Sequence, residues 1–209
     1  MIHILDSIIF WPFVIGAILL MITPGPDMTF FLGKSLVQGR NGGFAAMFGA
    51  ITGVILHSIA AAFGLSALIL NAPTVFMGLK IVGALYLLWL GYQAARYGSS
   101  ARFETTGAEE KLLSIYGAGI LINLLNPKVI LFFLAYLPQF VRPELGQVEG
   151  QFIGLGILFL VTVVPIAVAM ILSTEQLIGY IEKKPHILRY IDYSFAVLMA
   201  AFAIQLMLF

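Results

Sequence analysis

The chain contains little charge and no cysteine. Only 10% of its 209 residues are charged and 61% are hydrophobic, and its mean hydropathy is +1.03. A soluble domain carries about 25% charged residues, so this composition indicates an integral membrane protein. The absence of cysteine excludes disulfides, thiol redox chemistry and thiolate metal sites. The net charge of +1 gives no indication of nucleic-acid binding, so no nucleic acid is expected as a partner.

Long apolar runs predict an all-α integral membrane protein with six transmembrane helices. Each run can cross a hydrocarbon core of about 30 Å at about 1.5 Å per residue. In order, the predicted helices are Phe10–Gly33, Gly43–Leu70, Thr74–Arg96, Leu113–Pro138, Gln151–Leu172 and Tyr190–Phe209. Because the connections are short, residues 1–209 are expected to form a single transmembrane domain.

The basic residues are distributed unevenly among the loops. Most of them follow the first, third and fifth predicted helices, namely Lys34, Arg40, Arg96, Arg102, Lys111, Lys183, Lys184 and Arg189. The fourth loop carries Arg142 alone. Because cytoplasmic loops are enriched in Lys and Arg, both termini are predicted to be periplasmic or extracellular. Lys80 is expected to extend from an outer helix end to the headgroups.

The first predicted helix contains the sequence T-P-G-P-D at Thr23 to Asp27. Proline has no amide N–H, so the carbonyls of Leu20 and Ile22 lose their helical partners. The helix is therefore expected to break about 18 Å into the membrane, near its middle. A carboxylate at this depth costs about 2.5 to 3.5 kcal/mol. Such a segment predicts a solute pathway.

A second interruption, N-P-K at Asn126 to Lys128, falls at a similar depth in the fourth predicted helix. Thr23 and Asn126 are each a capping residue followed by proline, which predicts that a helix restarts at both places. Three helices followed by three insert in opposite orientations. The chain is therefore predicted to form two inverted repeats, about residues 8–97 and 112–209, each with a broken first helix.

The two breaks predict a substrate site near the membrane midplane. Half-helix N-termini suit a carboxylate, and Asp27 suits an ammonium group or a proton. An amino acid carries both charged groups. The predicted substrate-binding residues are Thr23, Pro24, Gly25, Pro26, Asp27, Asn126, Pro127 and Lys128. Lys128 can also pair with Asp27 in the empty site, so that substrate or proton competes with that pair.

Two interpretations of His57 are open. It continues an i, i+4 row formed by Ala45, Gly49 and Gly53, a stripe of small residues typical of close helix packing. Its imidazole either forms a hydrogen bond across that packed interface or takes part with Asp27 in proton coupling.

Two other polar residues also need an account. Asn123 lies one turn before Asn126, and it either lines the pathway or bonds to a neighbouring helix. Asp192, at the start of the last predicted helix, is expected to be exposed and to pair with Lys183, Lys184 or Arg189.

Three segments resemble the LysE/RhtB family of bacterial amino-acid exporters. They are T-P-G-P-D, the run Gly78 to Tyr92, and the run Leu125 to Phe140. The segments occur in the expected order, and the resemblance covers nearly the whole chain. It implies efflux of amino acids or close derivatives from the cytoplasm, by proton antiport with alternating access. It also implies a homodimer in the bacterial inner membrane.

An alternative hypothesis is an exporter of an inorganic cation, because distant relatives of this superfamily move metals. A hard cation needs several oxygen ligands, and Asp27 is the one acid expected deep in the membrane. We therefore expect no metal site. We also expect no enzymatic activity and no cofactor, because the chain lacks H-E-x-x-H, G-x-S-x-G and cysteine.

Overall fold

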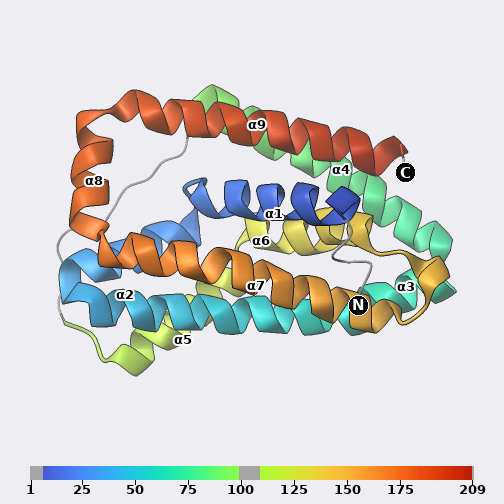
Figure 1. Ribbon diagram of the computed structural model, residues 1–209, viewed down its shortest axis with the longest axis horizontal. Coiled ribbons are helices and arrows are strands. Elements are labelled where there is room, and N and C mark those ends of the chain that lie inside the picture. Colours follow the sequence, from blue (N-terminus) through green and yellow to red (C-terminus); the bar gives the residue numbers. More distant parts are fainter. Residues whose placement is uncertain (1–6, 99–108, 209) are drawn as a thin grey trace.

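The computed structural model describes residues 7–98 and 109–208, and all regular elements in these ranges are helices (Figure 1). Arg102 and Phe209 lie outside the described residues. The main helices are α1 (Ser7–Ile22), α2 (Pro26–Ala60), α3 (Ser66–Asn71), α4 (Pro73–Tyr97), α5 (Leu112–Leu124), α6 (Pro127–Leu131), α7 (Val148–Leu172), α8 (Thr174–Lys183) and α9 (Pro185–Leu208). π-Helical turns at Ala61–Leu65 and Phe132–Tyr136 follow α2 and α6, and short 3₁₀ helices occupy Leu137–Phe140 and Pro143–Leu145.

Four helical segments are long and apolar enough to cross a membrane. They are Pro26–Asn71, Thr74–Tyr97, Val148–Leu172 and His186–Ile204. A bent pair, Leu112–Leu124 with Pro127–Phe140, can make a fifth span with a bend of 49°. The predicted all-helical membrane fold is confirmed, and the fourth predicted helix is broken where N-P-K predicts it.

The helix labelled α2 changes direction sharply at Gln38 and Gly39. Gly39 has φ 68° and ψ −170°, a conformation that favours glycine. In Figure 1 the chain continues the direction of α1 up to this bend and then returns along the bundle. The two arms pack tightly, since a Cβ on Gly43 would lie 2.9 Å from the Ser35 Cβ. The first predicted helix therefore comprises α1 and the arm from Pro26 to Gln38, which extends beyond its predicted end at Gly33.

Helix α8 was not predicted from the sequence. It crosses one end of the bundle between α7 and α9 (Figure 1). Ile178 and Ile181 on one side are buried, whereas Glu175 and Tyr180 are exposed. This division is typical of a helix that lies at a membrane interface. The last helix also begins at Pro185 instead of the predicted Tyr190.

The stripe of small residues on α2 packs against α5. A side chain on Gly49 would collide with the Tyr116 backbone, and one on Gly53 would collide with the Asn123 side chain. The predicted role of this stripe in close helix packing is confirmed. It brings α5 directly against the part of the bundle that contains the first break.

An aromatic cluster fills the bundle between the breaks and the end at which α1 begins. It consists of Phe13, Phe132, Tyr136, Phe140 and Phe202, all buried, with ring centroids 3.9 to 6.1 Å apart for the contacting pairs. The Tyr136 hydroxyl donates a hydrogen bond of 2.7 Å to the Pro12 carbonyl. The bundle is therefore closely packed on this side of the breaks.

Candidate functional site at the two helix breaks

The first break separates α1 from α2. The Thr23 amide and hydroxyl both donate to the Leu19 carbonyl, at 3.1 and 2.6 Å, so Thr23 ends α1. Gly25 is extended, with φ −159° and ψ 177°, and α2 begins at Pro26. The predicted cap at Thr23 is therefore wrong. Its hydroxyl bonds backward, and the chain stays extended through Gly25, which becomes an N-cap without a side chain.

The second break lies between α5 and α6. Asn126 is extended, and its Oδ1 accepts a 3.0 Å hydrogen bond from the Lys128 amide. Pro127 occupies the first helical position. The predicted cap at Asn126 is confirmed, and this break satisfies its own first helical amide.

Lys128 joins the two breaks. Its Nζ donates to the carbonyls of Leu20 and Thr23, each at 2.9 Å. The Leu20 carbonyl is one of the two that the prolines deprive of a helical partner, so the second break satisfies the first. Gly25 leaves room for this contact, because a Cβ there would lie 3.0 Å from Nζ.

Lys128 and Asp27 do not form a direct ion pair in this structure. Their charged atoms are not within the 4.0 Å of an ion pair, whereas those of Lys34 and Glu110 are. Asp27 Oδ2 instead accepts a 2.8 Å hydrogen bond from Asn123 Nδ2. Asn123 therefore joins the polar cluster, as one of its two interpretations predicts.

Three polar atoms of this cluster have no hydrogen-bond partner. Asp27 Oδ1, Asn123 Oδ1 and Asn126 Nδ2 are buried, and none of them is hydrogen-bonded among the described residues. The two oxygens are acceptors and the nitrogen is a donor. Because buried polar groups are normally hydrogen-bonded, this set is typical of a site that receives a polar ligand.

His57 also contacts Asn123. Its ring stacks on Phe133 with centroids 5.4 Å apart, and its Nε2 is 3.4 Å from the Asn123 carbonyl oxygen. This arrangement fits the interpretation of His57 as a residue bonded across a packed interface. Its contact with Asp27 is indirect, through Asn123.

The predicted site residues divide between two cavities. A cavity of about 70 Å³ is lined by Asp27, Lys128 and Asn123 together with apolar residues of α2 and α7. A larger cavity of about 340 Å³ is lined by Thr23, Pro24, Gly25, Pro26, Asn126, Pro127 and Lys128. It also includes Tyr97, which is 69% exposed at the end of α4. Lys128 belongs to both cavities, and the larger one extends to the end of α4.

Asp192 lines the larger cavity and is only 2% exposed. The expectation that Asp192 is exposed is therefore wrong. Helix α9 packs against α4 here, and Gly91 allows the close approach, since a Cβ there would lie 3.0 Å from the Ala196 carbonyl oxygen. The position of Asp192 along the chain gives no sign of this burial, which depends on the pairing of α4 with α9.

A family model for the LysE type translocators matches residues 18–208. The chain belongs to this family. Membership confirms the resemblance carried by T-P-G-P-D, the run Gly78 to Tyr92 and the run Leu125 to Phe140, and it identifies the protein as a membrane translocator.

Similar proteins occur in several bacteria. An uncharacterized membrane protein of Pseudomonas aeruginosa is 31% identical over 78% of this chain and 76% of its own length. A leucine efflux protein of Enterobacter sp. (strain 638) is 33% identical over 63% of each chain. An uncharacterized membrane protein of Vibrio cholerae is 30% identical over 73% of this chain and 74% of its own length. No solved structure matches the chain.

Proposed function

We propose that this LysE-family protein exports amino acids or close derivatives from the cytoplasm across the bacterial inner membrane. The observation that carries the proposal is the pair of cavities at the two breaks, which share Lys128 and are lined by buried polar atoms of Asp27, Asn123 and Asn126 that have no hydrogen-bond partner among the described residues. A leucine efflux protein among its relatives supports amino acids as the substrate class. Lys128 and Asn126 suit the substrate carboxylate.

The proposed architecture has six spans arranged as two inverted repeats, about residues 8–97 and 112–209. The first span is α1 with the first arm of α2, and the fourth is α5 with α6. Helix contacts support a two-fold relation: α4 packs against α9, the second arm of α2 against α5, and α1 against α7. Exchange of the repeats would leave the first contact unchanged and interchange the other two. We expect the protein to form a homodimer.

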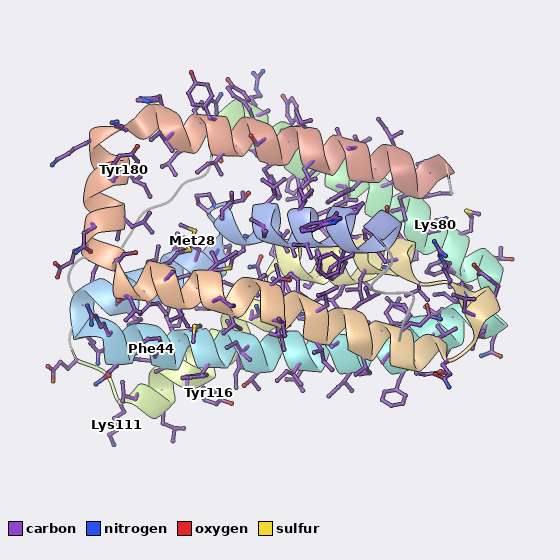
Figure 2. The ribbon with its side chains drawn as sticks, in the orientation of Figure 1. Met28, Phe44, Lys80, Lys111, Tyr116 and Tyr180 are labelled. Carbon is purple, nitrogen blue, oxygen red and sulfur yellow. The ribbon has the colours of Figure 1, made fainter. Side chains whose placement is uncertain are left out.

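The proposed orientation places the basic end of the bundle in the cytoplasm. Lys111 lies at one end of the bundle and Lys80 near the other (Figure 2). The end with Lys111 also carries the α2 bend and α8, with Arg40, Lys183 and Lys184 (Figure 1). Positive-inside bias therefore favours this end as cytoplasmic and both termini as periplasmic.

The two sides of the breaks differ in how open they are, and alternating access accounts for this difference. The larger cavity extends toward the basic end at Tyr97, whereas the aromatic cluster around Tyr136 closes the other side. This conformation corresponds to a state open to the cytoplasm, as required for loading cargo to be exported. Outward opening would require the rings around Tyr136 to separate.

Asp27 is the proposed proton-coupling residue, with His57 as a secondary candidate through Asn123. The Asp27 carboxylate lines the smaller cavity together with Lys128. When this carboxylate gains a proton, the net charge around the breaks changes. Asp27→Asn should retain exchange of labelled amino acid between two sides at equal pH but lose accumulation driven by an imposed pH gradient. Undiminished gradient-driven accumulation by Asp27→Asn would show that the carboxylate has no coupling role.

Counterflow in proteoliposomes tests the transport function. Vesicles loaded with an unlabelled amino acid should take up the same amino acid in labelled form. Within the described residues, no three His, Asp or Glu side chains gather closely enough to hold a metal ion. Uptake of a divalent cation but of no amino acid would therefore overturn the proposal and favour the inorganic cation alternative.

A further inference from the structure

The smaller cavity is polar only where it meets the two breaks. Most of the residues that line it are buried, and the polar ones among them are Asp27, Asn123 and Lys128. Asn123 donates to Asp27 at 2.8 Å, and Lys128 Nζ donates to the carbonyl of Thr23, four residues before Asp27. Asp27 Oδ1 is buried here without a hydrogen-bond partner among the described residues. The polar groups therefore form one end of the cavity.

The rest of the cavity extends from this polar end toward the bend of α2. The Asn123 side chain lies against Gly53, since a Cβ there would collide with it. Met47 also lines the cavity and lies six residues before Gly53, about 9 Å nearer the bend at 1.5 Å per residue. Helix α7 runs to the same end of the bundle (Figure 1), and its lining residues continue as far as Ala167. An apolar space thus leads away from the polar groups.

This apolar space suits an uncharged hydrocarbon group. Its volume of about 70 Å³ is several times what one water needs, and apolar cavities stay dry and take apolar guests. Met28 and Met47 are flexible, so its wall can adapt to guests of different shape. Beyond the polar end, the described lining offers no partner to a charged group. Burying a second charge of the cargo here would therefore be costly.

Lys128 determines where the charged end of an amino acid would lie. It lines both cavities, so a carboxylate bound to its ammonium group lies where the smaller cavity begins. The larger cavity extends from there to the end of α4 and provides the route of entry. The side chain of such a molecule can then enter the apolar space.

We propose that the smaller cavity holds the side chain of the cargo, and that the cargo is an amino acid whose side chain is apolar and several carbon atoms long. Val164 on α7 and Ala50 on α2 line this space and limit the size of side chain that it accepts. This inference rests on the proposed amino-acid export, and it adds the substrate class and the residues that select it.

A homologous series of competitors tests the inference on the full-length protein in proteoliposomes. Counterflow of labelled leucine would be measured against unlabelled alanine, 2-aminobutyrate, norvaline and norleucine, which differ by one methylene at each step. The inhibition constant should fall about fourfold for each methylene that the cavity buries. Lysine should inhibit weakly. Equal inhibition along the series, or strong inhibition by lysine, would overturn the inference.

Two substitutions on α7 test the location of the side-chain site. Val164→Phe narrows the cavity, and it should raise the inhibition constant of norleucine about tenfold or more but that of alanine less than about twofold. The matched control is Val161→Phe, three residues away and 65% exposed, which should leave the whole series unchanged. A smaller amount of folded protein would lower the rate without changing this size preference.

Ala50→Leu narrows the same cavity from α2 and should shift the size preference in the same direction. It decides the question if Val164→Phe does not fold. An unchanged series in a folded variant of either kind would contradict the location.

The outcomes separate the two proposals. A wild-type protein that moves no labelled amino acid would contradict the exporter function itself. A wild-type protein that moves leucine without any dependence on side-chain length, or that moves lysine in preference to leucine, would contradict only the side-chain site.

Discussion

The break between α1 and α2 and the break between α5 and α6 satisfy their backbone groups in different ways. The second is capped locally, by Asn126 Oδ1 on the Lys128 amide. The first has no side-chain cap in the described structure, and its Leu20 and Thr23 carbonyls accept hydrogen bonds from Lys128 Nζ. The second break is capped by its own residue, whereas the first break depends on a side chain from the second for its hydrogen bonds.

A second hydrogen bond also extends from the region of the second break to the first break. Asn123, just before the second break, donates to Asp27, just after the first. Both ties therefore extend from the second half of the chain to the first. Because side chains of α5 and α6 hold the conformation of the first break, their release would let the first break change shape while the second keeps its cap. This asymmetry suits a transporter in which substrate or proton binding competes for the same groups.

Removing the Lys128 ammonium group should reduce transport and stability more than any of the other substitutions below. Lys128→Met leaves the two carbonyls at Leu20 and Thr23 without their donor, at a cost of about 1 to 3 kcal/mol each. We expect loss of leucine counterflow and a lower free energy of unfolding, measured by SDS titration in detergent micelles. Lys80→Met, toward the N-terminal end of α4, is the control. Equal behaviour of the two variants would mean that Lys128 does not hold the first break.

Displacing Asn123 should have the next largest effect. A Cβ on Gly53 would collide with the Asn123 side chain, so Gly53→Ala moves the amide that donates to Asp27. We expect about 1 to 3 kcal/mol of destabilisation from overpacking, together with slower counterflow. Gly117→Ala on α5 is matched, because no described atom lies within 4 Å of its Cβ position. Alanine alone favours the helix over glycine, so if Gly117→Ala is as harmful as Gly53→Ala, the contact with Asn123 does not explain the loss.

Gly25→Ala should have a smaller effect that is specific to the first break. Its extended backbone accepts any residue, but the added Cβ would lie 3.0 Å from Lys128 Nζ and 3.2 Å from Cε. Because a lysine end is flexible, we expect about 1 kcal/mol of destabilisation and a severalfold rise in KM for leucine. The matched change is Gly78→Ala, in open space on α4. Wild-type KM in Gly25→Ala would refute the proposed importance of this contact.

Substitutions at Asn126 and Thr23, the two predicted caps, should lower the free energy of unfolding by different amounts. Asn126→Ala removes a true cap and should cost about 1 kcal/mol of unfolding free energy. Thr23→Val removes a hydroxyl whose acceptor, the Leu19 carbonyl, keeps its bond from the Thr23 amide, so the cost should be about 0.5 kcal/mol or less. Thermal unfolding of the two variants in the same detergent measures the difference. A larger loss from Thr23→Val would reverse the assignment of the cap.

Much of this arrangement follows from local sequence rules. Proline removes a specific hydrogen bond, so both breaks were predicted near the correct residues, and glycine spacing predicted the close packing of α2. Proline does not specify the donor that replaces the lost bond, and the contact from Lys128 to Leu20 depends on how two distant helices pack. The burial of Asp192 likewise depends on α4. Helix α8 is short and half polar, and its charged residues therefore suggested a loop.

The most direct test of the asymmetry is a double-mutant cycle between Gly25→Ala and Lys128→Met. Free energies of unfolding of the wild type, both single variants and the double variant would be measured in one detergent. If Lys128 holds the first break across Gly25, the Gly25→Ala penalty should disappear in the Lys128→Met background, with a coupling energy of about 1 kcal/mol. Additive penalties would contradict the account, because the two residues would then act independently.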